Sequence, residues 1–220
     1  MARRVADDPA GRDEAIAVLR SGGVIALPTD TVYGIAVALE TPGGIEQLYA
    51  AKSRPPDKAI ALLVTDVDQA AEIGELSEAA RVLAGAFWPG GLTLVVPRRA
   101  DRPLPAALTG GPFAPGEIAT VGLRVPGHAT PRALAAAVGP LPTTSANRSG
   151  EPEARDADEI EAILGDAVDL ILDGGPSSGG LASTAVDLTG GGLRILRHGA
   201  VPEAAIRRSL ESATLPEVGR

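Results

Sequence analysis

Short apolar runs of strand length alternate along the chain with segments whose apolar residues recur every three or four positions. The runs end at a proline or a polar residue, which predicts buried strands over 24–27, 59–64, 92–96, 121–125 and 170–172. The 3.6-residue spacing, with its capping and stop residues, predicts helices over 12–21, 77–86, 130–139, 156–164 and 202–210. A further helix is expected to start at Thr41-Pro42 and to end before Pro55-Pro56, and 31–37 is expected to be extended.

The order of these elements favours a mixed sheet over a strictly parallel one. Helices and strands alternate irregularly, and two short strands predicted near the end, 185–188 and 193–196, follow each other directly. Neither an internal repeat nor a linker interrupts the pattern. We therefore predict an α/β (α+β) fold, with a polar tail over 1–8, a single domain over 9–210 and a C-terminal tail over 211–220.

The composition and the net charge exclude several classes of function, whereas they say less about the fold. The net charge is −8 and only five of the 220 residues are aromatic, which argues against a broad basic face or stacking platforms for nucleic acid. Cysteine is absent, so disulfides and thiolate metal sites are excluded. No run of about eighteen apolar residues and no signal-peptide core occurs, so we expect a cytoplasmic protein without a membrane anchor.

Polar clusters follow several predicted strands, where sites in open α/β sheets usually lie. The segments 28–34 and 142–150 each fit a simple turn as well as a site. The basic segment 52–58 fits either cations at a helix C-terminus or a clamp for polyphosphate. Arg124 lies inside an apolar strand, so its charge needs a partner, either a buried carboxylate or an anionic ligand.

Familiar nucleotide and metal motifs are missing, and one motif points elsewhere. The chain contains no Walker-type phosphate loop, no Gly-x-Gly-x-x-Gly and no His-Glu-x-x-His. The segment 175–179 matches Gly-x-Ser-x-Gly, and Asp187 and His198 follow Ser177 in the chain order of an α/β-hydrolase triad. Because a helix should follow the serine directly and none is predicted there, the hydrolase is the weaker hypothesis.

Together these segments resemble the YrdC-type threonylcarbamoyl-AMP synthase family, from about Glu14 to about Val201. The resemblance rests on an ordered series of motifs with family-like spacing. They are Pro-Thr-acid-Thr-x-Tyr-Gly at 28–34, Lys-x-Arg-Pro at 52–55, Phe-Trp-Pro-Gly-x-Leu-Thr at 87–93, Arg-x-Pro at 124–126, Ser-x-Asn at 145–147, Ser-Thr at 183–184 and Leu-Arg-x-Gly at 196–199.

The resemblance implies a twisted, mixed open sheet with surrounding helices and a concave basic cleft. It implies an enzyme, a nucleotidyltransferase that makes threonylcarbamoyl-AMP and pyrophosphate from L-threonine, bicarbonate or CO2, and ATP, for tRNA modification. The catalytic residues would be Lys52, Arg54, Ser145 and Asn147. ATP would contact Arg54, Lys58, Thr120, Ser145 and Arg197, and L-threonine would contact Thr31, Arg124, Thr143 and Ser183.

Mg2+ is expected as a cofactor held mainly by the ATP phosphates, with no protein ligand named. The expected partners are the substrates, a downstream tRNA threonylcarbamoyl transferase complex and a weak contact with tRNA, with no membrane. Two positions depart from the family pattern, since Leu63 replaces a histidine of some relatives and Glu153 replaces a small polar residue. The alternatives are an RNA-binding module and a paralogue of the same fold without this activity.

Overall fold

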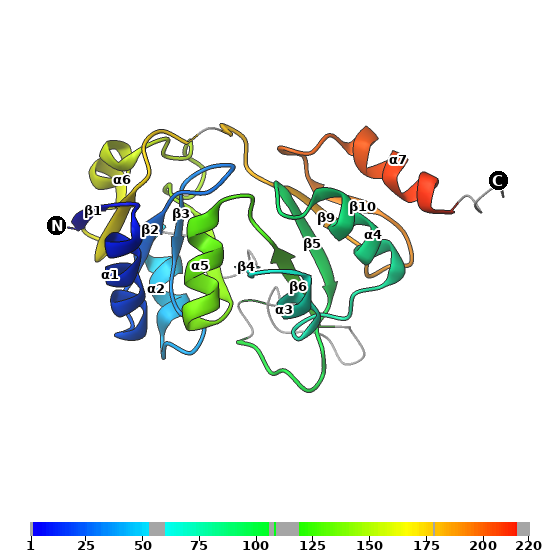
Figure 1. The fold of residues 1–220 in the computed structure, drawn as a ribbon, viewed down its shortest axis with the longest axis horizontal. Coiled ribbons are helices and arrows are strands. Elements are labelled where there is room, and N and C mark those ends of the chain that lie inside the picture. The colour runs from blue at the N-terminus through cyan, green and yellow to red at the C-terminus, as the bar shows by residue number, and fades with distance from the viewer. Residues whose placement is uncertain (1, 53–59, 106–107, 109–118, 178, 215–220) are drawn as a thin grey trace.

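The computed structural model describes residues 2–52, 60–105, 108, 119–177 and 179–214. In these residues one mixed sheet runs the length of the molecule (Figure 1). Its strands are β1 (Arg3–Ala6), β2 (Ile25–Leu27), β3 (Gly34–Ala36), β4 (Ala61–Leu63), β5 (Leu92–Pro97), β6 (Thr120–Arg124), β7 (Leu141–Ser145), β8 (Leu170–Asp173), β9 (Thr184–Asp187) and β10 (Arg194–Arg197).

The spatial order of the strands is β1-β8-β2-β3-β7-β4-β6-β5-β9-β10. Four neighbouring pairs are parallel, namely β1 with β8, β8 with β2, β4 with β6, and β5 with β9; the other pairs are antiparallel. The predicted mixed open sheet is therefore confirmed. The two late strands pair as a hairpin, as their adjacency in the sequence suggested.

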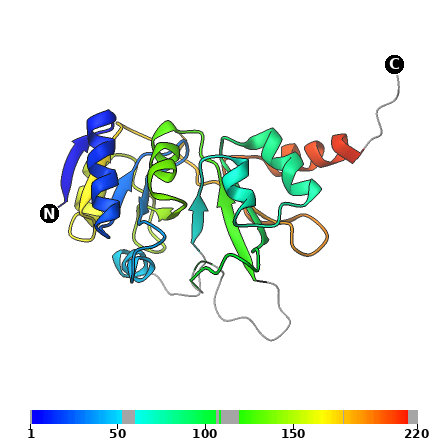
Figure 2. The same ribbon diagram turned by 60° about the horizontal axis from the view of Figure 1, so that its bottom comes forward.

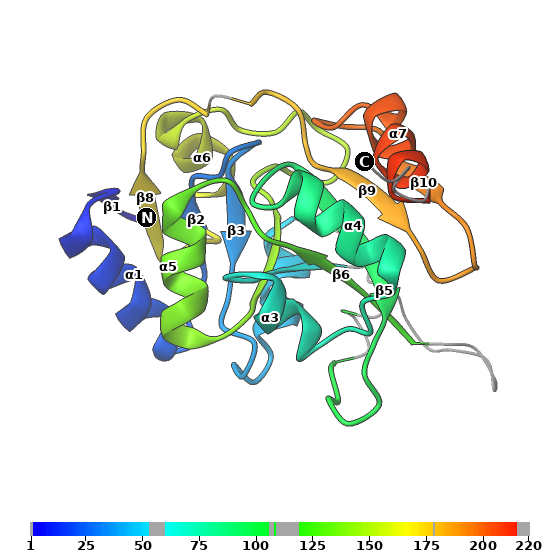
Figure 3. The same cartoon turned by 45° about the vertical axis from the view of Figure 1, so that its right-hand side comes forward.

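Helices cover both faces of the sheet. They are α1 (Pro9–Arg20), α2 (Gly44–Ala51), α3 (Val67–Ala71), α4 (Glu78–Phe87), α5 (Ala129–Val138), α6 (Ala157–Leu164) and α7 (Glu203–Thr214). Ile25 and Leu27 of β2 pack in a core with α1 and α5, whereas Ala26 between them belongs to the larger core that includes α2 and α6. Figures 2 and 3 show α1 and α5 on one side of these strands and α2 on the other.

Several predicted helix starts are confirmed by their caps. The hydroxyl of Ser77 accepts from the Ala80 amide at 3.2 Å, and the carboxylate of Asp156 accepts from the Glu159 amide at 2.9 Å. Each cap satisfies an amide that has no partner within its helix. The start predicted at Thr41 is wrong by a few residues, because α2 begins at Gly44 and its N-cap is a glycine in the left-handed region.

Both predicted tails contain regular structure. Arg3–Ala6 forms the edge strand β1, parallel to β8, and Arg4 forms an ion pair with Asp173 at 2.8 Å. Strand pairing is made by main-chain hydrogen bonds, so the side chains of this edge strand can be polar. The sequence therefore offers no apolar run from which β1 could be predicted. At the other end, α7 continues to Thr214, beyond the predicted boundary at 210. Among the described residues, no helix is both long and apolar enough to cross a membrane.

Candidate active site

One cavity of about 360 Å³ is lined by residues of β3, β7, β4, β6, β5, β9 and β10 and of the turns beside them. Alternation along the strands explains its polar lining. In β5, Leu92 and Leu94 are buried in the larger core, whereas Thr93 between them lines the cavity. In β6, Val121 and Leu123 are likewise in the core. The residues between and beside them face the cavity instead, namely Thr120, Gly122 and Arg124.

Sheet register brings together residues that are far apart in sequence. Gly34 of β3 pairs with Ser145 of β7, and Thr143 of β7 pairs with Ala61 of β4. A Cβ atom on Gly34 would lie 2.8 Å from the Thr143 methyl carbon, so a side chain there would push into the cavity wall. The cavity is lined by residues from each predicted ligand group: Thr31, Thr120, Arg124, Thr143, Ser145, Ser183 and Arg197.

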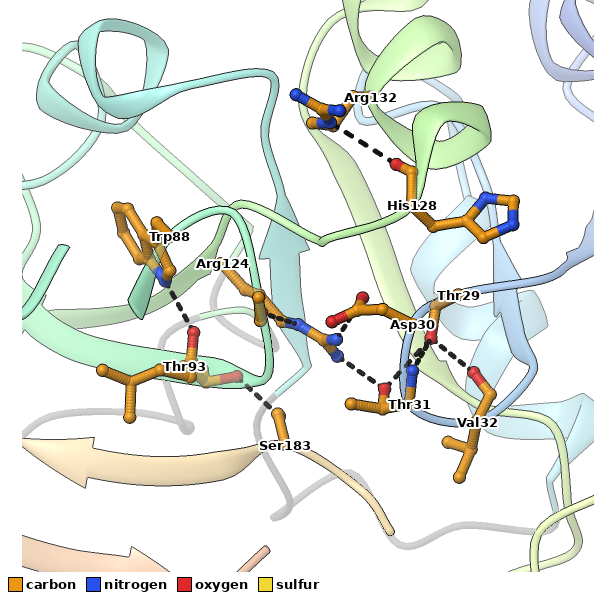
Figure 4. Close-up of polar contacts among 12 residues, drawn as sticks. Thr29, Asp30, Thr31, Val32, Trp88, Thr93, Arg124, His128, Arg132 and Ser183 are labelled. Atoms are coloured by element: carbon orange, nitrogen blue, oxygen red, sulfur yellow. Dashed lines mark hydrogen bonds and ion pairs between the residues drawn. The ribbon is translucent and has the colours of Figure 1, made fainter. Parts of the chain in front are cut away.

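Arg124 is the central cation of the cavity wall, and its side chain is only 7% exposed. Its guanidinium donates to the Gly90 carbonyl at 2.9 Å, to Thr31 Oγ1 at 2.9 Å and to Asp30 Oδ1 at 2.6 Å (Figure 4). The turn that holds Thr31 is itself braced, because Thr29 Oγ1 donates to the Val32 carbonyl at 2.7 Å. Arg124 thus has a carboxylate partner, although the Asp30 side chain is itself 21% exposed, and two further N–H groups of Arg124 remain beyond these three bonds.

The electrostatics of this wall favour an anion. Burial lowers the pKa of the Arg124 guanidinium, and the neighbouring charge of Arg197 lowers it further, whereas Asp30 acts in the opposite direction. The positive charges of Arg124 and Arg197 therefore face the same cavity, which is partly shielded from water. The described lining contains hydroxyl groups and these two cations but no carboxylate. A bound anion would relieve the repulsion between the two guanidinium groups.

A second polar turn lies at the end of β7, where the Ala146 amide donates to the Tyr33 carbonyl at 2.8 Å. Lys52, 2% exposed, donates from Nζ to Asn147 Oδ1, to the Ser145 carbonyl and, at 3.3 Å, to Ser145 Oγ. Ser145 Oγ in turn donates to Asn147 Oδ1 at 2.7 Å. The structure therefore brings Lys52, Ser145 and Asn147 together, with the lysine beneath the turn. Arg54 and Lys58, which complete the predicted clamp, lie outside the described residues.

The third group is on the side of β9 and β10. Arg197 donates from Nε to the Ser183 carbonyl and from one terminal nitrogen to Ser183 Oγ, both at 2.9 Å. Ser183 Oγ also lies 2.8 Å from Thr93 Oγ1 (Figure 4). Leu63 lines the cavity as an apolar surface, whereas Glu153 is not among the lining residues.

Sequence reasoning missed three contributors. Asp30 and Thr93 stood inside the quoted motifs but received no role, although each contacts a predicted ligand residue. The third is Tyr33, a fully buried residue whose hydroxyl donates to the Gly175 carbonyl at 2.7 Å and accepts from the Gly174 amide at 3.0 Å. Burial raises the pKa of this hydroxyl. Tyr33 also stood inside the motif at 28–34, and a polar aromatic residue inside a buried segment needs a partner.

The hydrolase hypothesis is wrong. Ser177 is followed by strand β9 and not by a helix. Asp187 accepts from Thr189 and Arg194, and His198 Nδ1 lies 3.9 Å from a carboxylate oxygen of Glu203. These contacts do not join the three residues into a triad.

The comparisons with known proteins agree on one family. The family model of the Sua5/YciO/YrdC domain, described as telomere recombination, matches residues 17–199. A Mycobacterium leprae protein is 38% identical over 91% of this chain and 88% of its own length. The threonylcarbamoyl-AMP synthase of Bacillus subtilis is 33% identical over 88% of this chain but only 54% of its own length. That of Chromohalobacter salexigens is 35% identical over 81% of this chain and 92% of its own length.

Solved structures extend the agreement to the fold. The Sua5 protein of P. abyssi, crystallised with L-threonine, superposes with a TM-score of 0.85 at 30% identity, over 96% of this chain and 60% of that one. E. coli YciO superposes with a TM-score of 0.81 at 26% identity, over 92% of this chain and 98% of that one. On the family match and these relatives, the chain belongs to the Sua5/YciO/YrdC family.

Proposed function

We propose that this protein is an L-threonylcarbamoyladenylate synthase, which forms threonylcarbamoyl-AMP and pyrophosphate from L-threonine, bicarbonate or CO2, and ATP. The observation that carries the proposal is the convergence of two guanidinium groups and a set of hydroxyl groups on one cavity. These residues come from several strands and the turns beside them, and they include members of both predicted ligand groups. The names of the relatives support the same reaction.

The amino acid would lie against Thr31, Thr143, Ser183 and Arg124. The two guanidinium N–H groups of Arg124 left after its internal bonds suit a carboxylate, since a guanidinium can donate two parallel bonds. Leu63 and Ala61 offer apolar surface for a methyl group. A pocket discriminates one methyl group by only about 1–3 kcal/mol, so L-serine should be a poor but measurable substrate.

The nucleotide would lie toward Thr120, Ser145 and Arg197, with Arg54 and Lys58 completing the phosphate contacts. Lys52 and Asn147 would hold the Ser145 turn in place. Mg2+ would be bound chiefly by the phosphates and would neutralise their charge, because the described lining offers hydroxyl groups and cations and no carboxylate ligand. The adenylate would then pass to a tRNA threonylcarbamoyl transferase complex for the t6A modification.

The chemistry needs positioning more than a strong base. The neutral threonine amine would form a C–N bond with CO2 and lose one N–H proton to solvent, or react with bicarbonate and release water, to give a carbamate. A carbamate oxygen would attack the α-phosphorus, and the bond to the β-phosphate oxygen would break to release pyrophosphate. Because the nucleophile is already anionic, the protein's task is to hold it in line and to offset the charge of two anions.

The direct test is pyrophosphate release with ATP, Mg2+, bicarbonate and L-threonine, together with detection of the adenylate. We expect release only when all substrates are present, and a fall of about 100-fold in kcat/KM in Arg54→Ala. Arg207→Ala, which breaks an exposed pair with Glu203 on α7, is the matched control and should keep normal activity. Absence of threonine-dependent pyrophosphate release from the wild-type protein would refute the proposal.

A further inference from the structure

Thr93 has no role in the proposed reaction so far, yet it shares a hydrogen bond with a residue that does. Its Oγ1 lies 2.8 Å from Ser183 Oγ, and both side chains line the cavity. Both residues are almost fully buried, Thr93 at 5% and Ser183 at 4% exposure. Buried hydroxyl groups normally have partners for their protons, so the protons of this pair can be followed one by one.

Two hydroxyl groups carry two protons, and the bond between them uses only one. If Thr93 donates, Ser183 Oγ accepts from both Thr93 and Arg197, and the Ser183 proton is left to donate elsewhere. If Ser183 donates instead, the Thr93 proton is left over. Either arrangement leaves one O–H donor on the cavity side of the sheet.

Arg197 decides between the two arrangements. Its charged terminal nitrogen donates to Ser183 Oγ at 2.9 Å, and a hydroxyl that accepts from a cation becomes a stronger donor. The stronger donor is best matched with the strongest acceptor, which is an anion in the cavity and not the neutral Thr93 oxygen. We propose that Thr93 is a positioning residue that donates to Ser183 and so directs the Ser183 proton to the carboxylate of the amino-acid substrate.

This assignment rests on the proposed function, since it takes L-threonine as the amino acid. It also explains why strand β5 carries a threonine between apolar residues. Thr93 stands next to Ala185 of β9 in the sheet, so β5 supplies the hydroxyl from the strand adjacent to Ser183. A valine there would have nearly the same shape but would remove the donor.

The experiment compares Thr93→Val and Thr93→Ser with the wild-type enzyme. KM for L-threonine and for ATP are measured by pyrophosphate release, and Kd for L-threonine by calorimetry without turnover. We expect Thr93→Val to raise KM and Kd for L-threonine by about tenfold and to leave KM for ATP within about twofold. Thr93→Ser, which keeps the hydroxyl, should restore the affinity for L-threonine.

Thr130→Val is the matched control for loss of a buried threonine hydroxyl. Thr130 is fully buried outside the cavity and donates to Asp7 at 2.7 Å, so its variant should lower stability without changing KM for L-threonine. A Thr93→Val enzyme with wild-type affinity for L-threonine would overturn the inference, as would a parallel rise in KM for ATP or a failure of Thr93→Ser to recover. Those outcomes leave the proposed function intact, whereas a wild-type protein that binds L-threonine without releasing pyrophosphate would refute the function alone.

Discussion

Two polar turns beside the cavity, 29–31 and 145–147, are each held by a buried cation, but the cations differ. The turn 29–31 is held by Arg124, and the turn 145–147 is held by Lys52. In both, a long basic side chain from another segment is buried, and its charged end bonds to oxygen atoms of the turn. The comparison shows that a cation in a motif can shape a site from beneath as well as contact a ligand directly.

The difference between the turns lies in the geometry of the cation that holds each one. Arg124 forms an ion pair with Asp30 at 2.6 Å, and its planar group also donates to a carbonyl and a hydroxyl. Lys52 donates to a main-chain carbonyl, a hydroxyl and an amide oxygen. A guanidinium offers five donors in a fixed plane, whereas an ammonium has only three. Arg124 therefore keeps two N–H groups for a ligand after its three bonds to Gly90, Thr31 and Asp30.

The largest effect is expected from Lys52→Met, which keeps the volume but removes the donors. Ser145 and Asn147 would each lose a partner for a buried oxygen, so the free energy of unfolding should fall by about 3 kcal/mol. Urea unfolding measures this, with the exposed Arg207→Ala variant as the reference. A loss below about 1 kcal/mol would mean that the turn does not depend on Lys52, and that the two turns differ in plan.

A smaller effect is expected at the Arg124 turn, where Asp30 can be changed in two ways. Asp30→Ala leaves a buried guanidinium without its carboxylate and should cost about 2 kcal/mol, with a rise of about tenfold in KM for L-threonine. Asp30→Asn keeps an oxygen that accepts from Arg124 and should lose less than half as much. Equal losses in the two variants would show that charge, and not the position of the guanidinium, is what Asp30 supplies.

The smallest effect concerns acid stability away from both turns. Burial tends to raise the pKa of Asp187, but bonds from the Thr189 hydroxyl and amide and from Arg194 outweigh it, so the pKa lies below the ordinary value of 3.8. The stabilisation is therefore complete above about pH 4 and is lost as the pH falls through the lower, folded-state pKa.

Because this pair is partly exposed, we expect less than about 1 kcal/mol from it. Tm should fall less steeply between pH 4 and 2.5 in Asp187→Asn than in the wild type, with the exposed Asp13→Asn variant on α1 as the control. Identical slopes in wild type and Asp187→Asn would contradict the assignment.

Local chemistry in the sequence determined most elements of this protein. Apolar periodicity and capping residues such as Ser77 and Asp156 placed most of the helices and strands within a few residues. The motifs also named a set of ligand residues, of which those described at the cavity do converge. The local sequence pattern did not predict β1, whose pairing is made by the main chain. It also misplaced the start of α2, whose N-cap is Gly43.

Only the tertiary structure decided how the cavity is assembled. Lys52 meets Asn147 across 95 positions, Arg124 meets Thr31 across 93, and Thr93 meets Ser183 across 90. Such contacts depend on strand order and register, which place neighbours in space without leaving any periodic trace in either segment. The residue types that could carry the chemistry were therefore readable from the sequence. Whether each one contacts a ligand or braces its neighbour followed from the sheet.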